Sequence, residues 1–263
     1  MTFTIDLDGG RALVTGAGQG IGRATARSLA DAGASVVVND VVGDRADAVV
    51  AEIRSAGGQA DAAVFDVTDR HAVRAAFGAL DRVDILVNNA GNAGTEGFTP
   101  AVPFADTDPD SWDRFIRVNL YGIMYCTHAA LPLMIANGEG RIVTIISDAG
   151  RWGDAYLAPY AAAKAGAAGF CRSVAREVGR HGITVNCVSL GTVSTPTTTS
   201  ANEPDDPVDR DDETAQRALS QYIIRRRGEP ADVAAMVTYL ASPLASWITG
   251  QTFPVNGGYT LSL

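Results

Sequence analysis

A tyrosine and a lysine stand four positions apart in the segment Tyr160-Ala161-Ala162-Ala163-Lys164. The surrounding stretch 160–179 is rich in alanine and is predicted to be helical, so the phenol and the ammonium share one helix face. A phenol titrates at about pH 10 unaided, and a neighbouring ammonium favours the phenolate and lowers that pKa. Such a tyrosine can exchange a proton with a substrate oxygen. The alternative is an ordinary exposed pair, because this spacing is common by chance.

A glycine-rich turn occupies 15–22, with the sequence Thr-Gly-Ala-Gly-Gln-Gly-Ile-Gly. It lies between a predicted buried strand and a predicted amphipathic helix at 21–32. Backbone N–H groups of such a turn can approach a phosphate closely, at the positive end of the helix dipole. The spacing T-G-x-x-x-G-x-G departs from the strict G-x-G-x-x-G pattern, so a tight turn without a ligand remains an alternative.

Asp40 follows the second predicted strand and lies 18 residues after Gly22 (40 minus 22). A carboxylate there can accept hydrogen bonds from the adenosine ribose hydroxyls and would repel a 2′-phosphate. No arginine or lysine stands at 39, 41 or 42, or within the glycine turn. The sequence therefore favours NAD over NADP, unless Asp40 is only a turn residue at the end of the strand.

Composition favours one domain over residues 1–263, with 46% hydrophobic residues to fill a large core. A net charge of −9 argues against nucleic acid or an anionic membrane as a partner. We find no apolar run approaching 18 residues, and the first strand begins too early for a signal peptide. We expect no membrane span and a cytoplasmic location.

The cysteines and histidines give no sign of a metal site. The three cysteines lie in apolar stretches without C-x-x-C spacing, as expected for reduced core residues: Cys126, Cys171 and Cys187. The three histidines are scattered along the chain: His71, His128 and His181. We predict that the protein binds no metal.

Strand and helix patterns alternate along the chain. The predicted strands are 11–15, 35–39, 62–66, 84–88, 141–147, 183–188 and 252–255. This alternation is typical of a parallel sheet with helices on both faces. The predicted fold class is therefore α/β, a Rossmann-like, doubly wound, parallel, seven-stranded sheet.

Several motifs in register give the chain its resemblance to a known family. Besides the glycine turn and Tyr160/Lys164, they are Asp66-Val67, Asn88-Asn89-Ala90-Gly91, Asn119, and Ser147, which lies 13 residues before Tyr160 (160 minus 147). Together they resemble the short-chain dehydrogenase/reductase family, in its single-domain, NAD-type branch. The resemblance covers nearly the whole chain, including the tail 248–258.

The resemblance implies a role for each catalytic candidate. Tyr160 is the acid/base, Ser147 donates a hydrogen bond to the substrate oxygen, and Lys164 binds the nicotinamide ribose and tunes Tyr160. Asn119 holds a water that connects Lys164 to solvent. Fixed donors of this kind stabilise charge on the reacting oxygen. Taken alone, Ser147 is also consistent with a strand terminator, and Asn119 with a helix kink.

The resemblance also implies a set of cofactor contacts. These are Gly16, Gln19, Gly20, Ile21, Asp40, Asp66, Val67, Asn88, Ala90, Gly91, Tyr160, Lys164, Gly191, Val193 and Thr195. Leu190 stands where the family usually has proline, which relaxes the backbone of the loop expected to hold the nicotinamide amide. Asp148 stands where small residues are common. Trp152 is expected near the substrate mouth, unless it belongs to the core or an interface.

The predicted function is an NAD(H)-dependent oxidoreductase that interconverts a secondary alcohol and a ketone. One alternative is a 3-oxoacyl thioester reductase, in which the arginines at 225–227 would meet the phosphates of a coenzyme A carrier. They are also consistent with a solvated helix end and salt bridges. A second alternative is a dinucleotide-binding regulator without catalysis, because fold does not fix function.

Two further features concern the substrate and the assembly. An acidic segment at 197–222 leads into a helical pattern at 214–224, where the resemblance implies a substrate lid. The apolar face of that pattern, with Trp152 opposite, predicts a mainly hydrophobic, alicyclic or polycyclic substrate. A solvated loop is the alternative. The resemblance implies a homotetramer, because the family is usually tetrameric. The apolar stretches at 112–135, 161–178 and 247–263 agree with it, because such surfaces are costly to expose.

Overall fold

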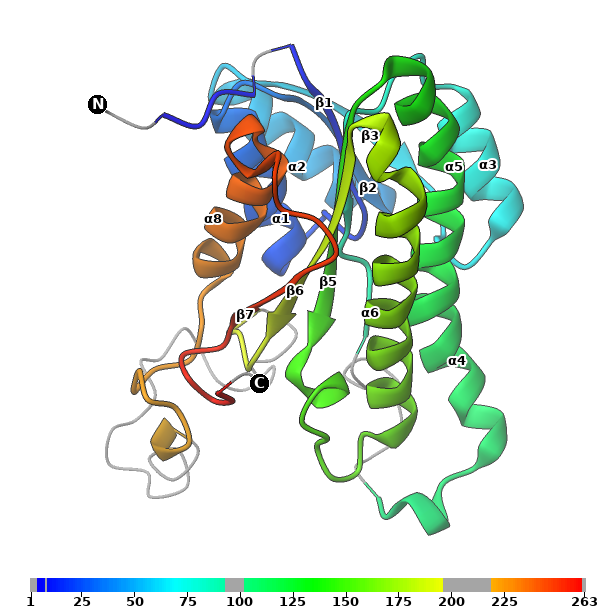
Figure 1. The fold of residues 1–263 in the computed structure, drawn as a ribbon, viewed down its shortest axis with the longest axis vertical. Helices are drawn as coiled ribbons and strands as arrows, with labels where there is room; N and C mark the ends of the chain where they lie inside the picture. The colour runs from blue at the N-terminus through cyan, green and yellow to red at the C-terminus, as the bar shows by residue number, and fades with distance from the viewer. Residues whose placement is uncertain (1–3, 8, 93–101, 196–218, 262–263) are drawn as a thin grey trace.

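The computed structural model describes residues 4–7, 9–92, 102–195 and 219–261. Seven strands form one parallel sheet in the order β3-β2-β1-β4-β5-β6-β7 (Figure 1). They are β1 (Arg11–Val14), β2 (Ser35–Asp40), β3 (Gln59–Val64), β4 (Ile85–Asn88), β5 (Gly140–Ser147), β6 (Ile183–Leu190) and β7 (Thr252–Val255). The predicted Rossmann-like fold is confirmed.

Helices cover the sheet on both faces (Figure 1). On one face lie α1 (Gly20–Asp31), α2 (Gly43–Ser55) and α8 (Pro230–Ala241). On the other lie α3 (Arg70–Gly78), α5 (Gly122–Asn137) and α6 (Ala158–Val178). Strand β1 shows how one strand serves two cores. Ala12 and Val14 point into the first, and Leu13 between them points into the second, because successive side chains alternate across a sheet.

The order of the strands determines where a ligand can bind. The chain runs outward from β1 through β2 to β3, and then returns to place β4 on the other side of β1. The connections that follow β1 and β4 therefore diverge, which leaves a crevice at the carboxyl ends of these strands. The glycine turn follows β1, and the Asn-Asn-Ala-Gly segment begins at the end of β4.

A long helical segment crosses the second face. It comprises α4 (Trp112–Ile116), a π-helical turn at Arg117–Tyr121 and α5. By length and composition alone, Pro109–Asn137 meets the criteria for a membrane span, which the sequence analysis did not anticipate. Ile123, Cys126 and Met134 are buried in the second core, so this part packs as a core helix. Other apolar side chains of the segment, such as Tyr121 and Ile135, are exposed, so part of its surface can contact a partner.

Several predicted elements differ from the structure by one or two residues at an end, and two differ more. Strand β3 begins three residues earlier and ends two residues earlier than expected, because it is an edge strand whose composition of Ala, Asp and Gln carries little apolar signal. The helical pattern expected through residue 224 ends at Ser220 among the described residues. Beyond it the backbone turns, and the N–H of Ile224 donates to the carbonyl of Gly257. The rest of the predicted lid lies outside the described residues.

Candidate active site

A cavity of about 780 Å³ lies at the carboxyl end of the sheet. Of the predicted site residues, those that line it are Gly16, Gln19, Gly20, Ile21, Asp40, Asp66, Val67, Ala90, Gly91, Ser147, Tyr160, Lys164, Gly191, Val193 and Thr195. The structure thus brings the glycine turn and the catalytic candidates into one space. Asn88 and Asn119 are not among the lining residues and lie behind the cavity wall.

The glycine turn is packed too tightly for side chains. A Cβ on Gly22 would lie 2.2 Å from the carbonyl oxygen of Gly16, and a Cβ on Gly16 would lie 2.9 Å from the Cα of Ala90. Gly16 also has a φ of +60°, which favours glycine. Helix α1 starts at this turn, and no described side chain caps its first N–H groups. These groups can therefore accept an anion such as a diphosphate.

Asp40 is a turn residue that also lines the cavity. Its carboxylate accepts hydrogen bonds from the backbone N–H groups of Gly18 and Val42, each at 3.0 Å, as a turn residue does. It also lines the cavity and is 6% exposed. Arg45 lines the cavity beside it. The sequence analysis missed this arginine because it lies on α2, five residues beyond Asp40 in the chain.

Asn88 was predicted to contact the cofactor, but the structure places its side chain in the core. Its amide nitrogen faces the hydroxyl oxygens of Thr127 and Thr144, at 3.1 and 3.4 Å. Asn89 is the residue at the cavity. Its side-chain amide donates to the carbonyls of Thr15 and Gly16, at 2.9 and 3.0 Å. Side chains alternate along a strand, so adjacent asparagines at a strand end point to opposite sides.

Lys164 lies at the back of the cavity and is 3% exposed. Its ammonium donates to the carbonyl of Ile145 at 2.9 Å and lies 5.8 Å from the centre of the Tyr160 ring. Among the described residues, no carboxylate forms an ion pair with it. Burial lowers the pKa of Lys164 to about 8, because desolvation disfavours the charged form. Lys164 is also the only lysine in the chain.

Tyr160 lies on the first turn of α6, next to Ser147 at the end of β5. Burial raises the pKa of Tyr160, and a hydrogen bond with the Ser147 side chain acts in the opposite direction. The predicted lowering of this pKa by Lys164 is therefore wrong for this structure, because desolvation of the phenolate outweighs the other effects. The Ser147 hydroxyl also accepts a hydrogen bond from the N–H of Ala149 at 3.2 Å.

Asn119 lies in the π-helical turn and is fully buried. Its side-chain amide donates to the carbonyls of Asn92 and Phe115, at 2.9 and 3.0 Å, and its oxygen accepts from the N–H of Asn92 at 3.2 Å. Asn92 lines the cavity. Asn119 therefore holds the backbone beside the cavity from behind. A π-helical turn often marks a functional site because it redirects one side chain.

Other residues noted in the sequence lie in different surroundings. Trp152 is 72% exposed and is not among the residues that line the cavity. Arg226 forms an ion pair with Asp232 at 2.6 Å, which fits the salt-bridge interpretation. Arg227 lines the cavity. The three cysteines are buried and free.

Comparisons with known proteins agree with this geometry. A family model described as "Enoyl-(Acyl carrier protein) reductase" matches residues 16–260. The chain is 40% identical over 256 residues to a 3-oxoacyl-[acyl-carrier-protein] reductase of Synechocystis, covering 95% of this chain and 96% of the relative. It is 39% identical over 256 residues to the 7alpha-hydroxysteroid dehydrogenase of Escherichia coli K12, covering 96% of this chain and 94% of the relative.

A solved structure shows the same fold. The gluconate 5-dehydrogenase of Burkholderia cenocepacia, in complex with NADP and tartrate, superposes with a TM-score of 0.87 at 33% identity, covering 98% of each chain. The chain belongs to the short-chain dehydrogenase/reductase family, and it is an oxidoreductase of that family.

A substitution in the glycine turn tests whether this turn binds the dinucleotide. A Cβ on Gly18 would lie 2.6 Å from both the Asp40 carboxylate and the Cβ of Arg45. Gly18→Ala therefore displaces Asp40, and we expect the NADH dissociation constant to rise at least about tenfold, roughly 1.4 kcal/mol. Binding is measured by fluorescence titration.

The matched control is Gly169→Ala on α6. The nearest atom to its new Cβ, on the Arg172 guanidinium, is 3.8 Å away, so we expect NADH affinity to stay unchanged. Equal dissociation constants for the two variants would show that the turn at Gly18 does not hold the dinucleotide.

Proposed function

We propose that the protein is an NAD(H)-dependent dehydrogenase that interconverts a secondary alcohol and a ketone. One observation carries the proposal: Ser147, Tyr160 and Lys164 meet in the same cavity as the glycine turn. The uncapped start of α1 fits a diphosphate, and Asp40 fits a ribose. When bound, a nicotinamide dinucleotide supplies the hydride donor or acceptor.

The residues of the chain manage the proton and the charge. In ketone reduction Tyr160 gives its phenolic proton to the substrate oxygen, and in alcohol oxidation the phenolate takes it back. Ser147 donates a hydrogen bond to the same oxygen, which orients the substrate and stabilises developing charge. Lys164 provides positive charge behind Tyr160 and binds the nicotinamide ribose. Burial raises the pKa of Tyr160, because desolvation disfavours the phenolate.

Part of the cavity lining favours an apolar substrate. This part comprises Leu157, Leu190 and Leu219, together with the rings of Tyr222 and Tyr259. Such a surface fits an alicyclic or polycyclic alcohol. The similarity to a hydroxysteroid dehydrogenase points in the same direction.

A 3-oxoacyl thioester reductase is the second candidate. Arg227 lines the cavity, and a 3-oxoacyl-[acyl-carrier-protein] reductase is among the relatives. Arg226 is engaged with Asp232, so the three arginines do not form one free cluster. A regulator without catalysis is the non-enzyme candidate, and it has no need for the set of catalytic side chains.

A substrate panel with NAD tests the proposal, using hydroxysteroids, substituted cyclohexanols and 3-hydroxyacyl-CoA thioesters. We expect the highest kcat/KM for a cyclic alcohol. A higher kcat/KM for the thioesters, lost in Arg227→Ala, would instead support the thioester reductase. Failure to turn over any compound would favour the regulator.

Tyr160→Phe tests the chemistry itself. The variant keeps the ring and removes the proton, so we expect kcat to fall at least about a hundredfold while NADH still binds. Tyr239→Phe on α8 is the control, and should keep the wild-type kcat. Retention of most activity by Tyr160→Phe would contradict its assignment as the acid/base.

The proposed cofactor is NAD(H). Asp40 supports this choice, whereas Arg45 in the same cavity is a base that could meet a 2′-phosphate. We expect kcat/KM to favour NAD(H) over NADP(H) at least about tenfold, roughly 1.4 kcal/mol. Asp40→Ala should narrow the ratio and Arg45→Ala should widen it, whereas Asp44→Ala, an exposed control on α2, should leave it unchanged. Equal turnover with both cofactors in the wild type would contradict the proposal.

The proposed assembly is a homotetramer with three perpendicular two-fold axes, located in the cytoplasm. Exposed apolar side chains in two regions support it. Tyr121 and Ile135 on the long helical segment are each 41% exposed, and Trp247 near the C-terminal strand is 98% exposed. Contiguous exposed apolar surface is typical of interaction sites.

Light scattering at micromolar concentration tests the assembly. We expect the mass of four chains, and a smaller mass for Trp247→Arg, because a charge would be buried in the interface. A monomer in the wild type would contradict the proposal.

A further inference from the structure

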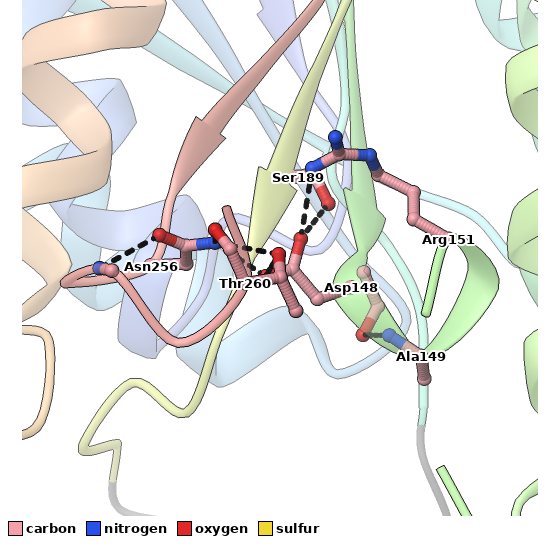
Figure 2. A network of polar contacts seen from close by, with 8 residues as sticks. Asp148, Ala149, Arg151, Ser189, Asn256 and Thr260 are labelled. Atoms are coloured by element: carbon pink, nitrogen blue, oxygen red, sulfur yellow. Dashed lines mark hydrogen bonds and ion pairs between the residues drawn. The ribbon is translucent and has the colours of Figure 1, made fainter. Parts of the chain in front are cut away.

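The residue after Ser147 is a buried carboxylate. Asp148 is 1% exposed and lies between β6 and the C-terminal segment 256–260 (Figure 2). Its backbone is also held in place. The carbonyl of Asp148 accepts hydrogen bonds from the N–H groups of Arg151 and Trp152, at 2.9 and 2.7 Å. Asp148 therefore connects the loop that follows Ser147 to the C-terminal segment 256–260.

The Asp148 carboxylate accepts hydrogen bonds from four side chains. One oxygen accepts from the Ser189 hydroxyl at 2.5 Å and from Arg151 at 3.3 Å. The other accepts from the Asn256 amide at 2.6 Å and from the Thr260 hydroxyl at 2.8 Å. A carboxylate offers about four lone-pair sites, so this one is saturated. A buried polar group so fully satisfied gives a rigid and specific arrangement.

The segment that Asp148 holds forms one wall of the cavity. Tyr259 lines the cavity, and its hydroxyl donates to Asp154 at 3.1 Å. Its ring stacks on Tyr222 with the centroids 5.2 Å apart. The Tyr222 hydroxyl in turn accepts from the N–H of Thr192 at 3.1 Å. Through these contacts the wall connects Asp154, in the loop between β5 and α6, to Thr192, in the loop after β6.

We propose that Asp148 is a positioning residue that fixes the C-terminal segment 256–260 as the substrate-facing wall of the active site, with Tyr259 as a determinant of substrate specificity. The identification of the space as a substrate pocket rests on the proposed function. The flat face of the Tyr222–Tyr259 pair packs against the ring of a cyclic substrate. Asp154 gives this wall a hydrogen-bond acceptor and disfavours a substrate carboxylate.

Asp148→Asn tests the proposal with little change in shape. An amide nitrogen cannot accept a hydrogen bond, so half of the contacts are lost. We expect KM for a cyclic alcohol to rise at least about tenfold, with kcat and the NADH dissociation constant nearly unchanged. Independently of activity, backbone amides in 256–260 should exchange with deuterium faster. Asp81→Asn, an exposed control with 82% side-chain exposure, should change neither.

A swap of the two partners provides the rescue. In the double variant Asp148→Asn/Asn256→Asp, the amide at 148 donates to the carboxylate at 256, and one negative charge remains in the network. We expect both KM and deuterium exchange to return toward wild-type values. Unchanged exchange in Asp148→Asn, or no recovery in the swap, would overturn the proposal.

The proposed function and the proposed role of Asp148 can be overturned separately. If no alcohol is turned over, the proposed function fails, and deuterium exchange still decides whether Asp148 holds the wall. If alcohols are turned over but KM does not respond to Asp148→Asn or to Tyr259→Ala, which removes the ring, the wall does not contact the substrate.

Discussion

The active site is built around one buried ammonium. The side chain of Lys164 is almost entirely removed from water, and the residues around it leave little space. A Cβ on Gly91 would lie 3.1 Å from the ammonium nitrogen, and one on Gly150 would lie 3.0 Å from the Cβ of Lys164. The carbonyl of Ile145 is the described acceptor. Burial of a cation with this little compensation disfavours its charged form, so the arrangement makes sense if the cavity receives a polar ligand.

The architecture makes that burial possible by bringing distant segments to one edge of the sheet. Strand β5 supplies Ile145 and Ser147, α6 supplies Tyr160 and Lys164, and the π-helical turn supplies Asn119, which braces the neighbouring backbone. Carboxyl ends of parallel strands converge at a switch in strand order. Asp148 also ties segment 256–260, which includes the cavity-lining Tyr259, to the loop that follows Ser147.

Much of this was predictable from the sequence, because motifs fix local geometry. The predicted glycine turn, Tyr160 and Lys164 line one cavity, and the alternation of strands and helices predicted the parallel sheet that the structure shows. Other features depend on contacts between distant residues. Asn88 was predicted to contact the cofactor, whereas Asn89 lines the cavity, because spacing does not say which side chain faces it. Arg45 lies outside the motif that ends at Asp40, and three partners of Asp148 lie far from it in the chain: Ser189, Asn256 and Thr260. Edge strand β3 lacks the apolar pattern that marks a buried strand.

The burial of Lys164 can be measured directly, because the chain has no other lysine. Protein labelled with carbon-13 at the lysine ε position has one lysine side-chain resonance, assigned by its loss in Lys164→Met. Its chemical shift is followed as the pH is raised in the absence of cofactor. The account predicts that Lys164 titrates with a pKa of about 8, because desolvation lowers it. A midpoint at the ordinary value of about 10.4 would show a solvated ammonium and contradict the account.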